Sequence, residues 1–117
     1  MSSQLRILIM LHDVDLLLRE LKNQEARKVE ERHGFKLVSH SQELIQARNE
    51  LVSKLEPMHL TRYERLMSKY GRAIVPVVHG VCGGCFIVLP TGEAYQKDKN
   101  DRVSNCANCG RYLYWID

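Results

Sequence analysis

Residues 81–110 read VCGGCFIVLPTGEAYQKDKNDRVSNCANCG, and this stretch holds all four cysteines of the chain. Zinc prefers a tetrahedron of thiolates, and two residues between ligands let one tight turn present both sulfurs to one ion. Glycine or asparagine lies in or beside each pair, and both tolerate the positive φ that such a turn needs. The spacing predicts one structural Zn²⁺ with no open coordination position. The predicted ligands are Cys82, Cys85, Cys106 and Cys109.

Two other chemistries use Cys-x-x-Cys pairs. A redox-active pair is expected once, near a strand–helix–strand pattern, and not twice in matched form. Disulfides need an oxidising compartment, and we see no export signal, because the apolar run from Ile7 to Leu11 is too short and is followed by His12 and Asp13. The same run is too short for a transmembrane helix. We therefore expect a cytoplasmic protein with no membrane contact. Iron also accepts four thiolates, so the cysteines alone do not separate it from zinc.

Length and charge set further bounds. A chain of 117 residues makes one modest domain or two very small ones. The segment after residue 70 is too short to fold easily on its own core, so a bound metal ion is expected to stabilise it. The formal net charge is +3, and four thiolates with one Zn²⁺ bring it to about +1. Bulk charge therefore gives little support for nucleic-acid binding.

The first half of the chain is predicted to be helical. Residues 4–32 carry an apolar seam at alternating spacings of four and three, as in a coiled coil. Gly34 is predicted to end this helix in the left-handed conformation, within a reversal over residues 33–35. A second helix is expected from Lys36 to Glu56, with leucines repeating at seven. The residues of the first seam are Ile7, Leu11, Val14, Leu18 and Leu21.

Two seams joined by a short turn favour an antiparallel hairpin. The alternative is pairing of the helices between chains, and a hairpin that also forms a homodimer is compatible with both. Pro57 is expected to break the second helix, and Met58 to Tyr70 to form a short linking helix that ends at Gly71. We interpret the apolar stripe of this linking helix as core and not as a ligand site.

From Ala73 the pattern changes to strands. Residues 73–78 are β-branched, and Pro76 among them indicates an edge strand. Residues 86–89 and 111–116 are the other two expected strands, with a polar loop or one helical turn over residues 93–100. This layout predicts a zinc ribbon, a small antiparallel sheet pinned at one end by metal. The expected fold class is α+β, with a helical hairpin and linking helix in residues 1–70 and the ribbon in residues 71–117.

Three stretches together resemble a known family. They are LRILIMLHDVDLLLREL near the start, YERLMSKYGRAIVPVVHGVCGGCFIVLP, and NCANCGRYLYWID at the end. The chain resembles the bacterial C4-type zinc-ribbon proteins with a long coiled-coil hairpin, the DUF164-type family. Family members have a much longer coiled coil than residues 4–56 can supply.

The resemblance implies a cytoplasmic, non-enzymatic protein and leaves nucleic-acid binding open. Some family members are tied to flagellar regulation through messenger RNA and the alternative sigma factor sigma-54. The family's four cysteine ligands correspond to the four cysteines of this chain.

Other candidate sites have plain structural alternatives. His79 lies three residues before Cys82, but four cysteines already complete a zinc shell, so we expect an exposed histidine. The C-terminal aromatics and nearby arginines are candidates for stacking and phosphate binding of single-stranded nucleic acid. We favour core packing for the aromatics, because a small ribbon needs them inside. The candidate nucleic-acid residues are Arg72, Arg111, Tyr112 and Trp115.

Two functional hypotheses follow. The first is a non-enzymatic adaptor or regulatory protein whose helical arm binds a protein partner, because a coiled-coil seam occurs without a catalytic constellation. The second is an RNA- or DNA-binding regulator that acts through the ribbon. Catalysis is not expected, because the predicted metal shell is closed.

Overall fold

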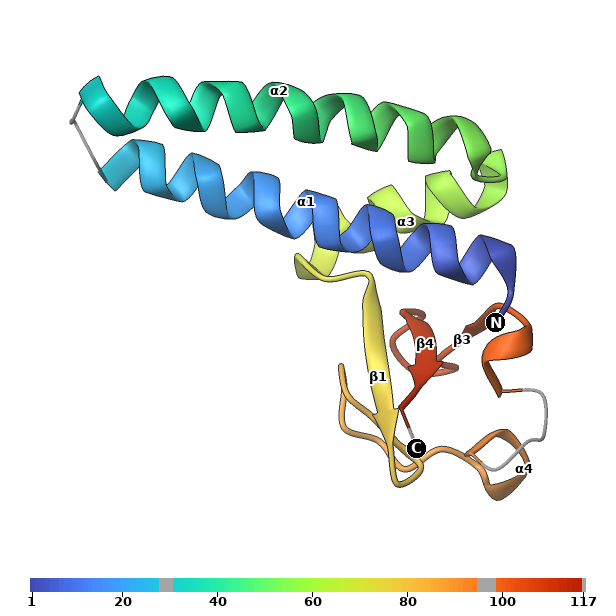
Figure 1. The fold of residues 1–117 in the computed structure, drawn as a ribbon. Helices are drawn as coiled ribbons and strands as arrows, with labels where there is room; N and C mark the ends of the chain where they lie inside the picture. Colours follow the sequence, from blue (N-terminus) through green and yellow to red (C-terminus); the bar gives the residue numbers. More distant parts are fainter. Residues whose placement is uncertain (28–30, 95–98, 117) are drawn as a thin grey trace.

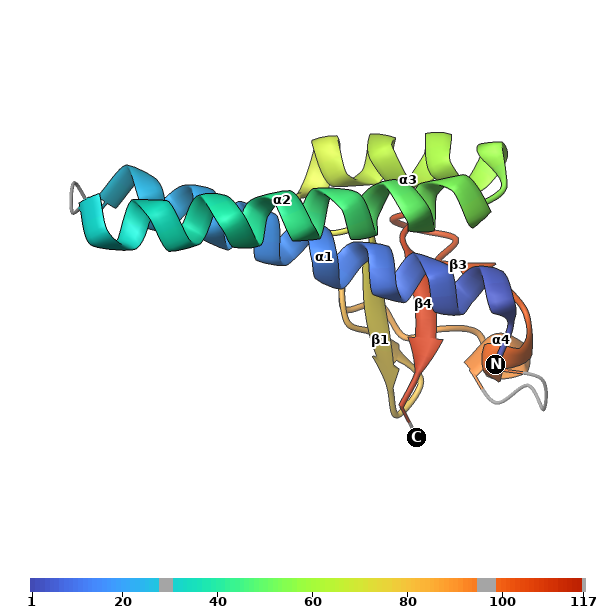
Figure 2. The same ribbon diagram turned by 45° about the horizontal axis from the view of Figure 1, so that its top comes forward.

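The computed structural model has three helices followed by a small four-stranded sheet, and this α+β architecture confirms the predicted fold class (Figure 1). It describes residues 1–27, 31–94 and 99–116. For residues 24–40 and 93–94 only the backbone is described. The helices are α1 (Ser3–Arg27), α2 (Glu31–Lys54) and α3 (Pro57–Tyr70). In both ribbon views α1 and α2 run side by side as an arm that extends beyond α3 and the sheet (Figures 1 and 2).

The hairpin forms within one chain, but its reversal is not where the sequence placed it. Helix α1 ends at Arg27 and α2 already begins at Glu31, so Gly34 lies inside α2. The prediction that Gly34 ends the first helix is therefore wrong. An interior glycine costs a helix only about 1 kcal/mol relative to alanine, which a helix of 24 residues tolerates. The connecting residues 28–30 lie outside the described part of the chain.

Helix α3 begins at Pro57, one residue before the predicted start, and ends at the predicted Tyr70. Pro57 occupies its first turn, where a missing N–H costs nothing. Gly71 ends it in the left-handed conformation (φ 74°), and its N–H donates to the carbonyl of Met67. Within the predicted apolar stripe, Tyr63 and Leu66 are buried, whereas Tyr70 is 37% exposed.

The sheet has the strand order β2-β1-β4-β3. Strands β2 and β3 were not predicted, and the expected strand over residues 86–89 is reduced to one bridge between Val88 and Val81. A short helix α4 (Thr91–Ala94) and a 3-10 turn at Lys99–Asp101 flank residues 95–98, which lie outside the described part. The strands are β1 (Ile74–Val78), β2 (Val81–Cys82), β3 (Ser104–Asn105) and β4 (Tyr112–Trp115).

Two expectations about the sheet are wrong. Strand β1 pairs with β4 in parallel, so the sheet is mixed and not purely antiparallel. Pro76 lies in a central strand and not at an edge. The sheet accepts this proline because β2 pairs only with Val77 and Val78. Beside Pro76 the chain has already turned into the first cysteine pair, where the N–H of Gly83 donates to the Pro76 carbonyl (2.8 Å).

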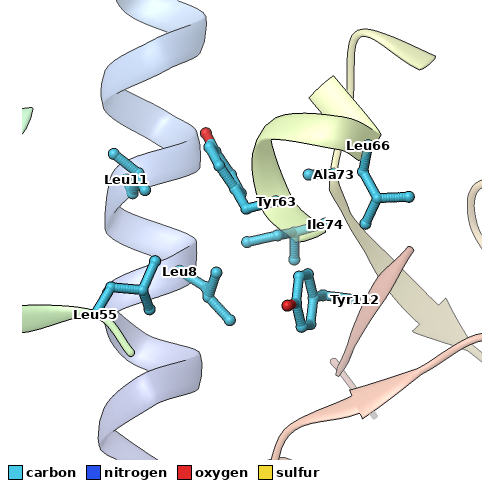
Figure 3. Close-up of a cluster of buried hydrophobic side chains, with 8 residues drawn as sticks. All are labelled: Leu8, Leu11, Leu55, Tyr63, Leu66, Ala73, Ile74 and Tyr112. Carbon is cyan, nitrogen blue, oxygen red and sulfur yellow. The ribbon is translucent and has the colours of Figure 1, made fainter. Parts of the chain in front are cut away.

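One hydrophobic cluster joins the helices to the sheet (Figure 3). Tyr63 of α3 and Tyr112 of β4 are fully buried in it, between α1 and the sheet. The cluster contains side chains from both sides of the predicted boundary at residue 70, so the two parts share a core. Its buried members are Leu8, Leu11, Leu55, Tyr63, Leu66, Ala73, Ile74 and Tyr112.

A polar centre on α1 also ties the helices together. Asp15 accepts hydrogen bonds from Arg48 Nε of α2 (2.7 Å) and from the Tyr63 hydroxyl of α3 (2.6 Å). Its side chain is only 15% exposed. One turn earlier, His12 Nε2 accepts a hydrogen bond from the Ala73 N–H, and burial together with nearby Arg72 lowers the pKa of this histidine. These contacts fix α2, α3 and the start of β1 against α1.

Candidate metal centre

The two cysteine pairs form turns with the same backbone hydrogen bonds. In the first, the Phe86 N–H donates to the Cys82 carbonyl and the Cys82 N–H donates to the Ile87 carbonyl (2.9 and 3.0 Å). In the second, Gly110 and Arg111 take the places of Phe86 and Ile87 around Cys106 (2.8 and 2.9 Å). This repeated turn, called a knuckle below, points both sulfurs of each pair toward one centre.

The four sulfur atoms fit a tetrahedral zinc ion. Cys82 Sγ lies 3.9 Å from Cys109 Sγ, and Cys85 Sγ lies 3.7 Å from Cys106 Sγ. All four atoms lie within 4.8 Å of one another. A tetrahedron with Zn–S bonds of 2.3 Å has sulfur–sulfur edges of about 3.8 Å. None of the four is in a disulfide, so the cysteines can hold one zinc ion as the sequence predicted.

The thiols of the cluster are in different electrostatic environments. Hydrogen bonds from the Asn108 side chain and the Ile87 backbone lower the pKa of Cys85 to about 6. Burial, followed by the neighbouring Cys106, raises the pKa of Cys109 to about 12, and burial also raises that of Cys82. Four close thiolates repel one another, and a dication removes that repulsion. Metal binding is therefore coupled to proton release and to folding of the ribbon.

The metal centre replaces part of the ribbon's core. Cys82 and Cys106 are buried, at 0% and 2% exposure, within a second small cluster on the sheet face away from the helices. Cys85 and Cys109 pack against it from the surface. The closed set of four ligands leaves structural stabilisation as the chemistry of the site. The members of the cluster are Val75, Val77, Cys82, Leu89, Cys106, Leu113 and Trp115.

These features define a zinc ribbon. Residues 81–113 match the family model of the C4-type zinc ribbon domain. The match agrees with the resemblance seen in the sequence and with its single zinc site. A comparison with curated proteins finds no significant match.

Three solved bacterial structures are similar to the chain. The first is CT398 of Chlamydia trachomatis, with 32% identity over 68% of this chain and 34% of that one (TM-score 0.57). The second is HP0958 of Helicobacter pylori, with 28% identity over 74% and 37% (TM-score 0.64). A protein from Mycobacterium smegmatis has 26% identity over 87% and 43% (TM-score 0.57). The matched part of this chain therefore spans 34–43% of the length of these proteins.

The predicted nucleic-acid residues do not form one exposed surface. Tyr112 and Trp115 are buried, at 0% and 6% exposure, so their rings offer no face to a base. This agrees with core packing, the alternative favoured from the sequence. Arg72 is exposed, and the Arg111 guanidinium lies 3.9 Å from the centre of the Tyr70 ring. His79 is exposed in the β1–β2 turn and does not belong to the metal cluster.

A cationic cleft lies beside the metal centre and was not predicted from the sequence. It encloses about 380 Å³ between α3 and the second knuckle. Arg62, Arg65 and Lys69 line it at spacings of three and four, which places them on one face of α3. Arg62 also donates to Asn105 Oδ1 (3.0 Å). The spacing of the three cations is visible in the sequence, but nothing in the sequence indicates that this helix face lies beside a knuckle.

In the part of the chain that the structure describes, no helix is both long and apolar enough to cross a membrane.

Proposed function

We propose that the protein is a non-enzymatic adaptor whose helical arm binds a protein partner. The supporting observation is the burial pattern of residues 16–23 of α1 and 41–47 of α2, called the distal arm here. None of these side chains is fully buried, although several are leucines of the predicted seams. Two helices alone cannot cover an apolar seam, and a third helix from a partner would complete it.

The distal arm has the chemistry of a helix-binding surface. Leu17 is 53% exposed and Ile45 is 48% exposed. A groove of about 460 Å³ is lined by Leu18 and Ile45, with Arg19 and Lys22 among its other residues. An amphipathic helix with apolar and acidic side chains would match this surface.

The adaptor proposal is tested by affinity purification from extracts of the cells that make the protein. Leu18→Glu combined with Ile45→Glu places two charges in this groove, and we expect it to reduce recovery of the partner at least about tenfold. Gln46→Glu, on the exposed side of the same helix, is the matched control and should retain the partner. Zinc content should be normal in both variants. If every protein recovered with the wild type is also recovered with the double variant, the adaptor function is excluded.

A second candidate function, nucleic-acid binding through the ribbon, is favoured by the cationic cleft. The described residues that line the cleft include three cations and no carboxylate. Tyr70 and Asn105 add a ring and an amide to the same lining. Cations that track phosphates, with a nearby aromatic ring, are typical of single-strand binding sites.

This candidate predicts a salt-dependent interaction with oligonucleotides. We expect Arg65→Glu with Lys69→Glu to weaken binding of a labelled single strand and to reduce the slope of log K against log salt by roughly 1 to 2. Fluorescence anisotropy between about 50 and 200 mM salt measures both quantities. Arg6→Glu with Lys54→Glu makes the same charge change away from the cleft and is the control. Equal losses in the two double variants would reject the cleft as the binding site.

A further inference from the structure

Phe86 has an unusual backbone conformation. Its φ is +64°, in the left-handed region where residues other than glycine are strained. The equivalent position of the second knuckle is Gly110, with φ +78° and the same N–H to carbonyl hydrogen bond. The fold of a knuckle therefore accepts glycine at this position and does not require a side chain.

Packing does not account for the phenyl ring. Phe86 is 76% exposed and belongs to neither of the two buried clusters. A strained residue that contributes nothing to the core is a marker of function. A flat aromatic ring is held outward at the surface of the first knuckle, where glycine would be less strained.

The surroundings of Phe86 indicate what the ring would contact. The Arg111 side chain passes close over Gly84 of the first knuckle. A Cβ added to Gly84 would collide with the Arg111 guanidinium. The same guanidinium stacks on Tyr70, which lines the cationic cleft. Phe86 follows Gly84 by two residues, so their Cα atoms are at most about 8 Å apart. The backbone of Phe86, which carries an exposed ring, thus lies near a chain of cations that begins in the cleft.

We infer that Phe86 is a base-stacking residue for single-stranded nucleic acid, with the phosphates of the same strand held by Arg111 and the cleft. This inference rests on the proposed nucleic-acid function and names the residue that would hold a base. An apolar protein contact is the competing role, because Val88 and Ile116 are also exposed. Those aliphatic side chains would serve such a contact without a strained aromatic ring, whereas a base needs a flat face.

The test is a set of substitutions at Phe86 measured against labelled oligomers of uridine and of thymidine, each about ten nucleotides long. Phe86→Gly removes the strain and the ring, so it should keep or raise Tm while weakening binding about tenfold. Phe86→Leu keeps an apolar side chain without a flat face and should weaken binding similarly. Phe86→Trp should bind like the wild type, and its added fluorescence should be quenched by the oligonucleotide. Val88→Ala is the control and should bind normally.

The outcomes separate this inference from the function on which it rests. Wild-type binding that Phe86→Gly leaves unchanged would overturn the stacking role and leave the nucleic-acid function standing. Normal binding by Phe86→Leu with weak binding by Val88→Ala would overturn it in favour of an apolar contact. A wild-type protein that binds neither oligomer would reject the nucleic-acid function itself, and the stacking role with it.

Discussion

Replacement of Cys106 by serine is expected to abolish zinc binding and to unfold the ribbon. The second hydrophobic cluster has seven buried members, two of which are ligand cysteines, so little core remains without the metal. Zinc binding to sites of this kind supplies about 10–16 kcal/mol of apparent free energy at neutral pH. Serine is a poor ligand, and the three remaining thiolates cannot close the shell.

Metal content and the fluorescence of Trp115 measure this loss together. Trp115 is the single tryptophan of the chain and is 6% exposed, so its emission should shift to the red when the ribbon unfolds. Most of the helical circular dichroism should persist, because the three helices pack on one another. His79→Ala is the control, since His79 lies near the first knuckle but outside the metal cluster, and it should retain zinc. Normal zinc content and unshifted emission in Cys106→Ser would contradict the metal-held core.

Replacement of Asp15 by alanine should destabilise the helical part by about 3 kcal/mol. The carboxylate accepts from Arg48 and from Tyr63 in a largely buried position, so its removal leaves two donors without their acceptor. Burial, and then the bond to Asp15, raises the pKa of the Tyr63 hydroxyl, which keeps that group protonated and donating. Urea unfolding followed by helical circular dichroism measures the change.

A double-mutant cycle isolates the hydrogen bond between Asp15 and Tyr63. Tyr63→Phe keeps the ring in the core and should cost about 1 kcal/mol. If the two groups interact as the structure places them, the double variant should be less destabilised than the sum of the two single changes, by about 1 kcal/mol. Strict additivity, or a loss below about 1 kcal/mol for Asp15→Ala, would show that the polar centre does not stabilise the fold.

The zinc ribbon was predictable because its determinant is local. Two cysteines at a spacing of two residues define a knuckle, and a second pair completes the ligand set without any knowledge of the sheet. The end of α3 at Gly71 was predictable for the same reason. The reversal near residue 30 was not, because a single glycine is a weak signal against the helical preference of its neighbours.

The non-local features were not predictable from the sequence. The parallel pairing of β1 with β4 depends on how the chain returns through both knuckles, and this pairing places Pro76 in a central strand. The core packing expected for Tyr112 and Trp115 is confirmed, but the sequence did not show that helices cover the sheet face of Tyr112 and knuckles the face of Trp115. Phe86 was predicted to lie in a strand, because its left-handed backbone conformation is visible only in the structure.

Native mass spectrometry of the purified protein, with metal analysis of the same sample, determines whether the four cysteines hold zinc. We expect one zinc ion per chain, bound by the four reduced cysteines and absent from Cys106→Ser. The same spectrum reports whether the protein forms a homodimer. A metal-free chain whose mass is short by the hydrogens of two disulfides would contradict the zinc ribbon and the nucleic-acid function proposed for it.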